Sequence, residues 1–340
     1  MELREIGEFG LIARIRNRLP AYLPRVFQGI GDDAAIASLS PGNDLVSTVD
    51  LMVEEVHFNL ALTSAHLLGR KSLAVNLSDM AAMGARPRFA LISLALPARI
   101  RVESVDEFYL GFLEMAEAHG VSLIGGDTSF SPDRLFISVT LLGEGKKEIL
   151  VCRHGARPGD DLYVTGTLGD SLLGLSLART LQGKSPLPDE KYLLEKHFNP
   201  IPRVQEGLAL AEKGLATAMI DVSDGLFSDL RHICEESRVG ATVFAQRIPQ
   251  SNAFQSLSPA LGRSGWQSAV RGGEDYELLF SAPPQKASEV MALARQWECG
   301  VTCIGKVEPI SHGIIIRDEQ GQVGPELLKG FDHFAAWEQN

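Results

Sequence analysis

Residues 73–84 read LAVNLSDMAAMG and close a longer segment, residues 64–83, whose small and apolar side chains predict a helix. Gly84 stands where a glycine commonly ends a helix. Within this apolar text Asn76 and Asp79 are three residues apart and therefore share a helix face. A carboxylate on a largely buried helix is unfavourable unless a partner compensates its charge. The sequence allows two partners for the Asp79 carboxylate: a metal cation, or a basic side chain in a buried salt bridge.

Helix and strand patterns are mixed through both halves of the chain, which predicts an α+β or α/β fold. Helices are expected at residues 5–19, 64–83, 104–119, 189–196, 202–214 and 285–297, near residue 170, and ending near residue 237. Strands are expected at residues 45–49, 89–96, 121–124, 135–142, 161–165, 217–220, 240–245, 276–282, 301–307 and 313–317. The length of 340 residues suggests about two domains, and the loop signature RHGARPG at 153–159 predicts their boundary near residues 145–155.

Composition excludes several classes of protein. The net charge of −11 argues against non-specific binding to nucleic acid or to anionic membranes, which requires a basic face. No run approaches the roughly 18 to 20 apolar residues that cross a bilayer. The first five residues, MELRE, are charged and lack the apolar region of a signal peptide, so a cytoplasmic protein is expected. The four cysteines lack zinc-site spacing and are expected to be thiols of a reducing compartment.

The common nucleotide-binding motifs are absent. Lys184 and Ser185 follow Gly183, but the residue five positions before that glycine is Ala178, so no P-loop is present. Residues 29–34 match the loose dinucleotide fingerprint, yet no clear strand precedes them and two aspartates would face the pyrophosphate. The sequence also lacks a nucleophile elbow, a zincin motif and the kinase signature set.

Aspartates instead recur at the expected ends of elements and beside glycines; they are Asp32, Asp33, Asp50, Asp79, Asp127, Asp221 and Asp224. Taken singly, most of them are ordinary turn or helix-cap residues, and Asp224 before Gly225 has the position of a helix cap. Two like charges about 4 Å apart repel by about 4 kcal/mol at an effective dielectric of about 20. Aspartates that converge on a polyphosphate therefore require divalent cations between them, and hard oxygen ligands favour Mg²⁺.

Basic and backbone groups supply candidates for the phosphate side. Residues 166–170, GTLGD, lie between an expected strand and an expected helix, so their N–H groups could cradle an anion. A plain strand-to-helix turn is the other interpretation. Arg153, at the expected domain boundary, could neutralise the charge of a transferring phosphoryl group.

Nine segments in order from residue 7 to residue 334 together resemble one family, the thiamine-monophosphate kinases of the aminoimidazole-ribonucleotide-synthetase-like ATP-binding superfamily. The segments are GEFGLI at 7–12, GIGDDAA at 29–35, VHF at 56–58, AVNLSDMAAMG at 74–84, GGDT at 125–128, VTGTLGDS at 164–171, IDVSDGL at 220–226, GGEDYEL at 272–278 and GFDHF at 330–334. The resemblance implies transfer of the ATP γ-phosphoryl group to thiamine monophosphate, with ATP as co-substrate and several Mg²⁺ ions. It further implies an N-terminal ATP- and Mg²⁺-binding domain (1–148), whose mixed sheet pairs in a homodimer, and a C-terminal α/β sandwich domain (149–340) that completes the active site.

The resemblance also implies the site residues. The implied Mg²⁺ ligands are Asp33, Thr48, Val49, Asp50, Asp79, Asp127, Asp221 and Asp224. The implied ATP contacts are Tyr109, Gly126, Asp127, Arg153 and Ser223, and the implied contacts of the thiamine substrate are His57, Glu274 and Phe331. No covalent nucleophile or general base is expected, and a packed histidine beside Phe58 is the alternative for His57.

One departure from the family concerns residues 48–50, which often read Ser-Thr-Asp in the family and read Thr-Val-Asp here. If residue 49 supplies only its backbone carbonyl, a valine is tolerable, whereas a required hydroxyl would weaken one metal site. Two other functions stay open: a superfamily relative that forms an acyl-phosphate or phosphorylates another small substrate, and a catalytically silent nucleotide-binding or scaffold protein.

Overall fold

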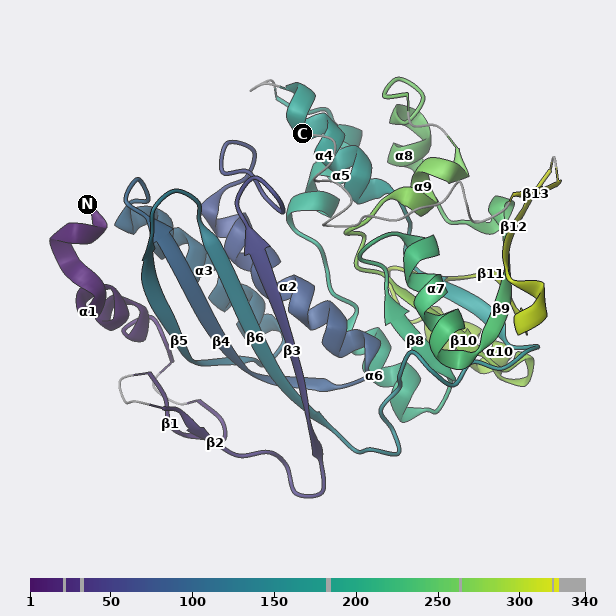
Figure 1. Cartoon of the computed structure of the whole chain (residues 1–340), viewed down its shortest axis with the longest axis horizontal. Helices are drawn as coiled ribbons and strands as arrows, with labels where there is room; N and C mark the ends of the chain where they lie inside the picture. Colours follow the sequence, from purple (N-terminus) through teal and green to yellow (C-terminus); the bar gives the residue numbers. More distant parts are fainter. Residues whose placement is uncertain (21–22, 31–33, 182–184, 263–264, 320, 324–340) are drawn as a thin grey trace. The chain divides into compact units, whose positions relative to one another are not determined.

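The computed structural model describes residues 1–20, 23–30, 34–181, 185–262, 265–319 and 321–323. They form two compact units. Unit 1 contains Met1–Met80 and Ala85–Glu148, and unit 2 contains Ala81–Gly84 and the described residues of Ile149–Asn340. Figure 1 shows helices and strands mixed within each unit, which confirms the predicted fold class.

Unit 1 is built on a four-stranded sheet in the order β3-β6-β4-β5, with the β4–β5 pair parallel and the others antiparallel. Helices α2 and α3 cover one face of this sheet (Figure 1). The elements are α1 (Leu3–Arg16), β1 (Val26–Gln28), β2 (Ile36–Ala37), β3 (Asp44–Val53), α2 (Ala65–Ala82), β4 (Arg86–Pro97), α3 (Val102–Ala118), β5 (Ser122–Ser131) and β6 (Phe136–Gly145).

Unit 2 contains a seven-stranded sheet in the order β13-β12-β9-β11-β7-β10-β8. Its strands are β7 (Asp161–Thr165), β8 (Ala218–Asp221), β9 (Val239–Phe244), β10 (Leu278–Ala282), β11 (Val301–Pro309), β12 (Ile314–Asp318) and β13 (Gly321–Val323). Its helices are α4 (Asp170–Leu181), α5 (Pro188–Phe198), α6 (Val204–Glu212), α7 (Leu226–Ser237), α8 (Asn252–Leu257), α9 (Trp266–Arg271) and α10 (Ala287–Ala294). Buried side chains of β7, β8 and β10 pack with those of α4 and α7 into one core.

Two strands of unit 1, β3 and β5, are at least twice as long as predicted. The expected strand at 45–49 ends before Asp50, but all ten residues of β3 pair with β6, so Asp50 lies inside the strand. The expected strand at 121–124 stops at the glycine pair, yet β5 continues beside β4 to Ser131 and also contains Asp127. A neighbouring strand thus extends both elements past residues that a local pattern treats as ends.

Two findings bear on the expected class of protein. None of the described helices is long and apolar enough to cross a membrane. All four cysteines are free thiols, as the sequence predicts.

Candidate active site

The first acidic group consists of Thr48, Asp50 and Asp79, which β3 and α2 bring together. Side chains alternate along a strand, so Thr48 and Asp50 share one face of β3. The Thr48 hydroxyl donates a hydrogen bond to the Asp79 carboxylate. Burial, together with the negative charge of Asp79, raises the pKa of Asp50 from 3.8 to about 7. Two carboxylates that disfavour each other's ionised form are suited to a divalent cation.

Val49 and Asp127 lie on the opposite face of the same sheet. Val49 is 62% exposed and alternates with its neighbours, so a hydroxyl at this position would point away from Asp79. Residues that pair across neighbouring strands lie on the same face of a sheet. Leu51 pairs with Ser138, Ser138 with Ser93, and Ser93 with Asp127, so this row of paired residues places Asp127 on the face of Leu51. Unit 1 by itself therefore does not place Asp127 beside the first acidic group.

Gly126 belongs to the neighbouring row of paired residues, in which Asp50 pairs with Val139, Val139 with Ile92, and Ile92 with Gly126. It therefore lies on the same face of the sheet as Asp50. A Cβ atom at Gly126 would stand 1.9 Å from the Ile92 carbonyl oxygen, and its φ is +157°. The strand contact therefore requires glycine at this predicted ATP contact.

His57 follows β3 in a tight turn in which Glu55 has a left-handed φ of +66°. The Val53 N–H donates to the His57 Nδ1 at 3.0 Å, so Nδ1 acts as an acceptor and the neutral ring carries its proton on Nε2. In this tautomer His57 can donate a hydrogen bond from Nε2 to a ligand. That role agrees with the predicted substrate contact and not with a general base.

The second acidic group consists of Asp221 at the end of β8, Asp224 in the turn that follows, and Asp229 in the first turn of α7. The cap role that the sequence leaves open for Asp224 is not realised, because Gly225 is the N-cap of α7. The buried Asp229 carboxylate instead accepts the N–H groups of Ser223 at 3.1 Å and Asp224 at 3.2 Å. Burial and the charges of Asp221 and Asp224 raise the pKa of Asp229 from 3.8 to about 8.

The turn at residues 166–170 does not offer the anion cradle that its sequence suggests. The Gly169 N–H donates to the Asp275 carboxylate at 2.7 Å, and the Ser171 N–H donates to the same group at 3.2 Å. The Leu168 N–H donates to the Pro249 carbonyl. The protein's own carboxylate thus occupies the place proposed for a phosphate, and burial raises the pKa of Asp275 well above its ordinary value while the two N–H bonds lower it.

Glu274 lies beside this carboxylate in the sequence GGEDYEL. Its Oε2 is 3.5 Å from the Nδ1 of the buried His197, which is also 2.9 Å from the Ser171 hydroxyl. The Glu274 side chain keeps 30% of its surface exposed, so it can also meet a ligand.

The comparisons with known proteins cover nearly the whole chain. Residues 31–144 match the AIR synthase related protein N-terminal domain, and residues 157–318 match the corresponding C-terminal domain. The thiamine-monophosphate kinase of Haemophilus influenzae is 38% identical over 97% of this chain and 98% of its own length. This chain belongs to the thiamine-monophosphate kinase family.

Two solved structures of the thiamine-monophosphate kinase family support the fold. That of the kinase from Stenotrophomonas maltophilia K279a has a TM-score of 0.82 at 38% identity and covers 93% of this chain and 97% of its own. A second, AaThiL complexed with AMPPCP and TMP, has a TM-score of 0.75 at 34% identity, with 98% of this chain and 99% of its own covered.

The other residues implied by the family resemblance fall into three groups. Arg153 is exposed and Ser223 half-buried, so both are open to a ligand. Tyr109 is only 3% exposed and its ring meets Phe108 edge-on, so the described surface offers little of it to ATP. Asp33 and Phe331 lie outside the described residues.

Sequence reasoning missed Asp229, Asp275 and His197. Asp229 had a usable signal, because it is a carboxylate in the apolar run FSDL of an expected helix, as Asp79 is in its own helix. Asp275 lies in the family segment GGEDYEL, but nothing local indicated its role, and His197 had no signal; their partners lie 106 and 26 residues away in the sequence.

The two acidic groups differ from a preformed metal site. Over the described part of the chain, no three His, Cys, Asp or Glu side chains converge closely enough to hold an ion by themselves. Mg²⁺ typically takes one or two carboxylates and completes its shell with water and substrate phosphates. Carboxylates whose negative charges repel one another fit an ion that arrives with a nucleotide better than a permanently caged ion.

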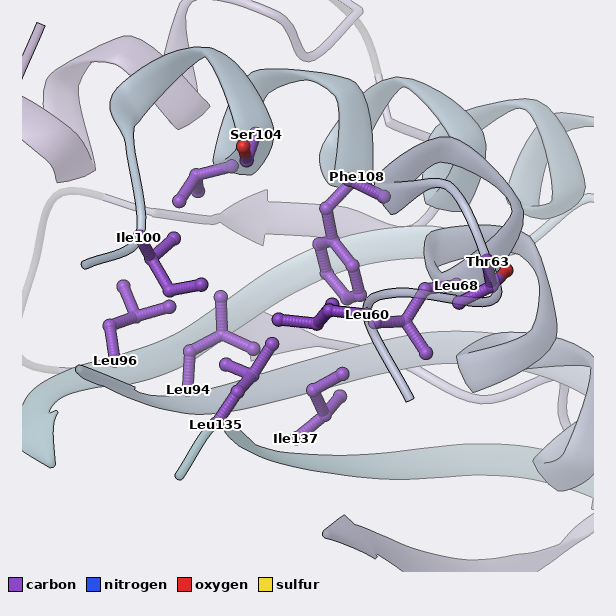
Figure 2. Close-up of a pocket in the computed structure, with 12 residues that line it drawn as sticks. Leu60, Thr63, Leu68, Leu94, Leu96, Ile100, Ser104, Phe108, Leu135 and Ile137 are labelled. Carbon is purple, nitrogen blue, oxygen red and sulfur yellow. The ribbon is translucent and has the colours of Figure 1, made fainter. Parts of the chain in front are cut away.

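A separate apolar pocket of about 160 Å³ lies between the helix-covered face of the unit 1 sheet and α3 (Figure 2). Leu94 and Ile137 of the sheet point toward Leu60 and Phe108, and Leu96 points toward Ile100 (Figure 2). None of the predicted site residues lines it. Phosphoryl transfer requires charged groups, and none of the described residues that line the pocket has a charged side chain, so this pocket is not the candidate active site.

Proposed function

We propose that this chain transfers the γ-phosphoryl group of ATP to thiamine monophosphate and releases thiamine diphosphate and ADP. The proposal is carried by likeness along nearly the full chain to AaThiL complexed with AMPPCP and TMP. Each unit also presents one acidic group of the kind that phosphoryl transfer requires.

Direct in-line transfer is the mechanism that these residues favour. The attacking phosphate oxygen of thiamine monophosphate is already anionic at neutral pH, so no strong general base is needed. His57 donates from Nε2 and orients the substrate, since its Nδ1 is engaged by the Val53 N–H. Glu274 offers a carboxylate to the cationic thiazolium ring.

The residues that would hold Mg²⁺ are Asp33, Thr48, Val49 through its carbonyl, Asp50, Asp79, Asp127, Asp221 and Asp224. Bound ions would neutralise the phosphate charge that these carboxylates otherwise repel. Gly126, Arg153 and Ser223 would contact ATP, and Phe331 would join His57 and Glu274 at the thiamine substrate. A cytoplasmic location belongs to the same proposal and is supported by the four free thiols.

One assay tests the function. The protein is incubated with ATP, Mg²⁺ and thiamine monophosphate, and thiamine diphosphate is measured, with EDTA as control. Product that depends on Mg²⁺ supports the proposal. ATP binding without product would favour a silent nucleotide-binding protein, and ATP turnover only with another acceptor would favour a superfamily relative.

The raised pKa values predict how stability depends on pH without a metal. The folded pKa of Asp50 is about 7 and that of Asp229 about 8, both above the ordinary 3.8. The folded state then keeps protons that the unfolded chain releases, so the free energy of unfolding falls as pH rises from about 4 to about 8, by up to about 1.4 kcal/mol per pH unit for each proton.

Urea unfolding in EDTA at pH 5 and pH 8 measures this fall. Asp229→Asn should make the fall shallower, because only the Asp50 proton then remains to be lost in this range. Asp106→Asn is the matched control, since its carboxylate pairs with Arg14 and has a lowered pKa. An equally steep fall in Asp229→Asn would contradict the assignment.

The homodimer that the resemblance implies is also part of this proposal, and its support is the open face of the unit 1 sheet. Leu45, Val49 and Leu51 are each more than half exposed on β3, although they are large and apolar. A second copy placed on this face would cover them and would meet Asp127, which lies in the row of Leu51.

Leu51→Asp should therefore convert a dimer to a monomer, because the substitution buries a charge in an apolar contact. Sedimentation velocity measures the change, and Leu110→Asp, on α3, is the matched control because Leu110 is also exposed but lies on a helix. The predicted interface would be refuted if the wild-type protein sedimented as a monomer, or if Leu51→Asp sedimented as a dimer.

A further inference from the structure

The segment Gly272–Glu277, which contains Glu274, runs directly beside the turn of the second acidic group. The Glu274 N–H donates to the Ser223 carbonyl at 2.8 Å, and the Tyr276 N–H donates to the Val222 carbonyl at 2.9 Å. The Val222 N–H donates in return to the Glu277 carbonyl at 2.8 Å. Three backbone hydrogen bonds thus fix this segment on one side.

The backbone of the segment is strained at two positions. Glu274 has a φ of +63° and Tyr276 a φ of +51°, and neither is glycine. A left-handed conformation is unfavourable for any residue with a side chain, so it persists only where surrounding contacts enforce it. Gly273 shows how close the approach is, because a Cβ atom there would lie 2.6 Å from the Ser223 carbonyl oxygen.

Asp275 lies between the two strained residues and fixes the segment on its other side. Its Oδ2 accepts the Gly169 N–H at 2.7 Å and its Oδ1 accepts the Ser171 N–H at 3.2 Å. Both donors belong to the start of α4, where helix N–H groups lack partners within the helix. A carboxylate at this end also meets the positive end of the helix dipole.

We infer that Asp275 is a positioning residue that holds Glu274 in its left-handed conformation and so sets the Glu274 carboxylate for the cationic acceptor substrate. The inference rests on the proposed function. The neighbouring acidic turn has a separate support, because Asp229 binds the N–H groups of Ser223 and Asp224. Two buried carboxylates therefore have different roles. Asp275 positions Glu274 for the acceptor substrate, and Asp229 positions the turn of Ser223 and Asp224 for ATP and its metal ion.

Asp275→Asn tests the inference in the full-length protein. One amide oxygen can accept one N–H, but the amide nitrogen cannot accept the other, so one donor at the start of α4 loses its partner. We expect the KM for thiamine monophosphate to rise about tenfold, while the KM for ATP changes less than about twofold. Asp229→Asn is the matched comparison and should instead raise the KM for ATP. Equal increases in both KM values for Asp275→Asn would overturn the inference.

A double variant separates positioning from general destabilisation. Glu274→Gln removes the charge that Asp275 is inferred to position. In that background Asp275→Asn should raise the KM for thiamine monophosphate no further, because residues that act through one group are not additive. An additive increase would show that Asp275 does not act through Glu274.

A second variant covers the case in which Asp275→Asn does not fold. Gly273→Ala pushes the segment away from Ser223 and leaves the buried carboxylate in place. Its increase in the KM for thiamine monophosphate should likewise vanish in the Glu274→Gln background. If it persists there, the inference is wrong.

These outcomes are distinguishable from failure of the proposed function. A wild-type protein that makes no thiamine diphosphate refutes the function itself. A Glu274→Gln variant with normal KM for thiamine monophosphate refutes the role of Glu274, and the inference with it. A raised KM in Glu274→Gln with a normal KM in Asp275→Asn refutes the inference alone.

Discussion

Asp79→Asn should lower turnover of ATP and thiamine monophosphate by about 100- to 1000-fold while the fold stays intact. Asp79 receives the Thr48 hydroxyl and stands close enough to Asp50 to raise its pKa. An amide keeps the shape and an acceptor for Thr48 but removes the charge that would balance a cation. The loss should therefore appear in kcat, with the unfolding midpoint near that of the wild type.

Turnover under saturating ATP and thiamine monophosphate, with circular dichroism of both proteins, makes this measurement. Asp106→Asn is the control, because Asp106 is another carboxylate of unit 1 that pairs with Arg14 and is not among the predicted ligands. Near-normal activity of Asp79→Asn in a folded protein would refute the metal-ligand role. A variant that loses its fold would favour the buried salt bridge, the other partner that the sequence left open.

The helix that carries Asp79 was predictable because its signal is local. Residues 64–83 were expected and α2 runs from Ala65 to Ala82, since an apolar run ended by a glycine is complete within one segment. The lengths of β3 and β5 were not predictable in this way. Whether a strand continues past Asp50 or past Gly126 depends on the backbone groups that β6 and β4 offer, and these stand far away in the sequence.

The same distinction explains which site residues the sequence revealed. The aspartates stood out because their residue type and spacing resemble a known family. Which face each one occupies was hidden, because the register that separates Asp127 from Asp50 is set by pairing across four strands. The anion cradle, one of two interpretations of residues 166–170, is not realised for a related reason, since Asp275 lies more than 100 residues away in the sequence and accepts the Gly169 N–H.

Arg203→Met should lower the free energy of unfolding by about 3 to 5 kcal/mol, because it leaves a buried carboxylate without its counter-charge. Glu277 is 1% exposed, and the Arg203 guanidinium holds both of its oxygens, with Nε at 2.6 Å and an Nη atom at 2.5 Å. The Thr165 hydroxyl also donates to this carboxylate at 2.7 Å. Lys196 cannot replace the arginine, since its Nζ lies 3.9 Å from the nearer oxygen.

Urea unfolding at pH 7 measures the loss, and Arg231→Met is the matched control. Arg231 pairs with Glu235 on the surface of α7 at 3.9 Å, so its removal should change stability by no more than about 0.5 kcal/mol. The double variant Arg203→Met with Glu277→Leu should recover much of the loss, because it removes the orphaned charge and fills the space with apolar atoms. If Arg203→Met alone is as stable as the wild type, the ion pair does not secure the strand that follows Glu274, and the rigidity of that segment must come from Asp275 and the backbone bonds to Val222 and Ser223.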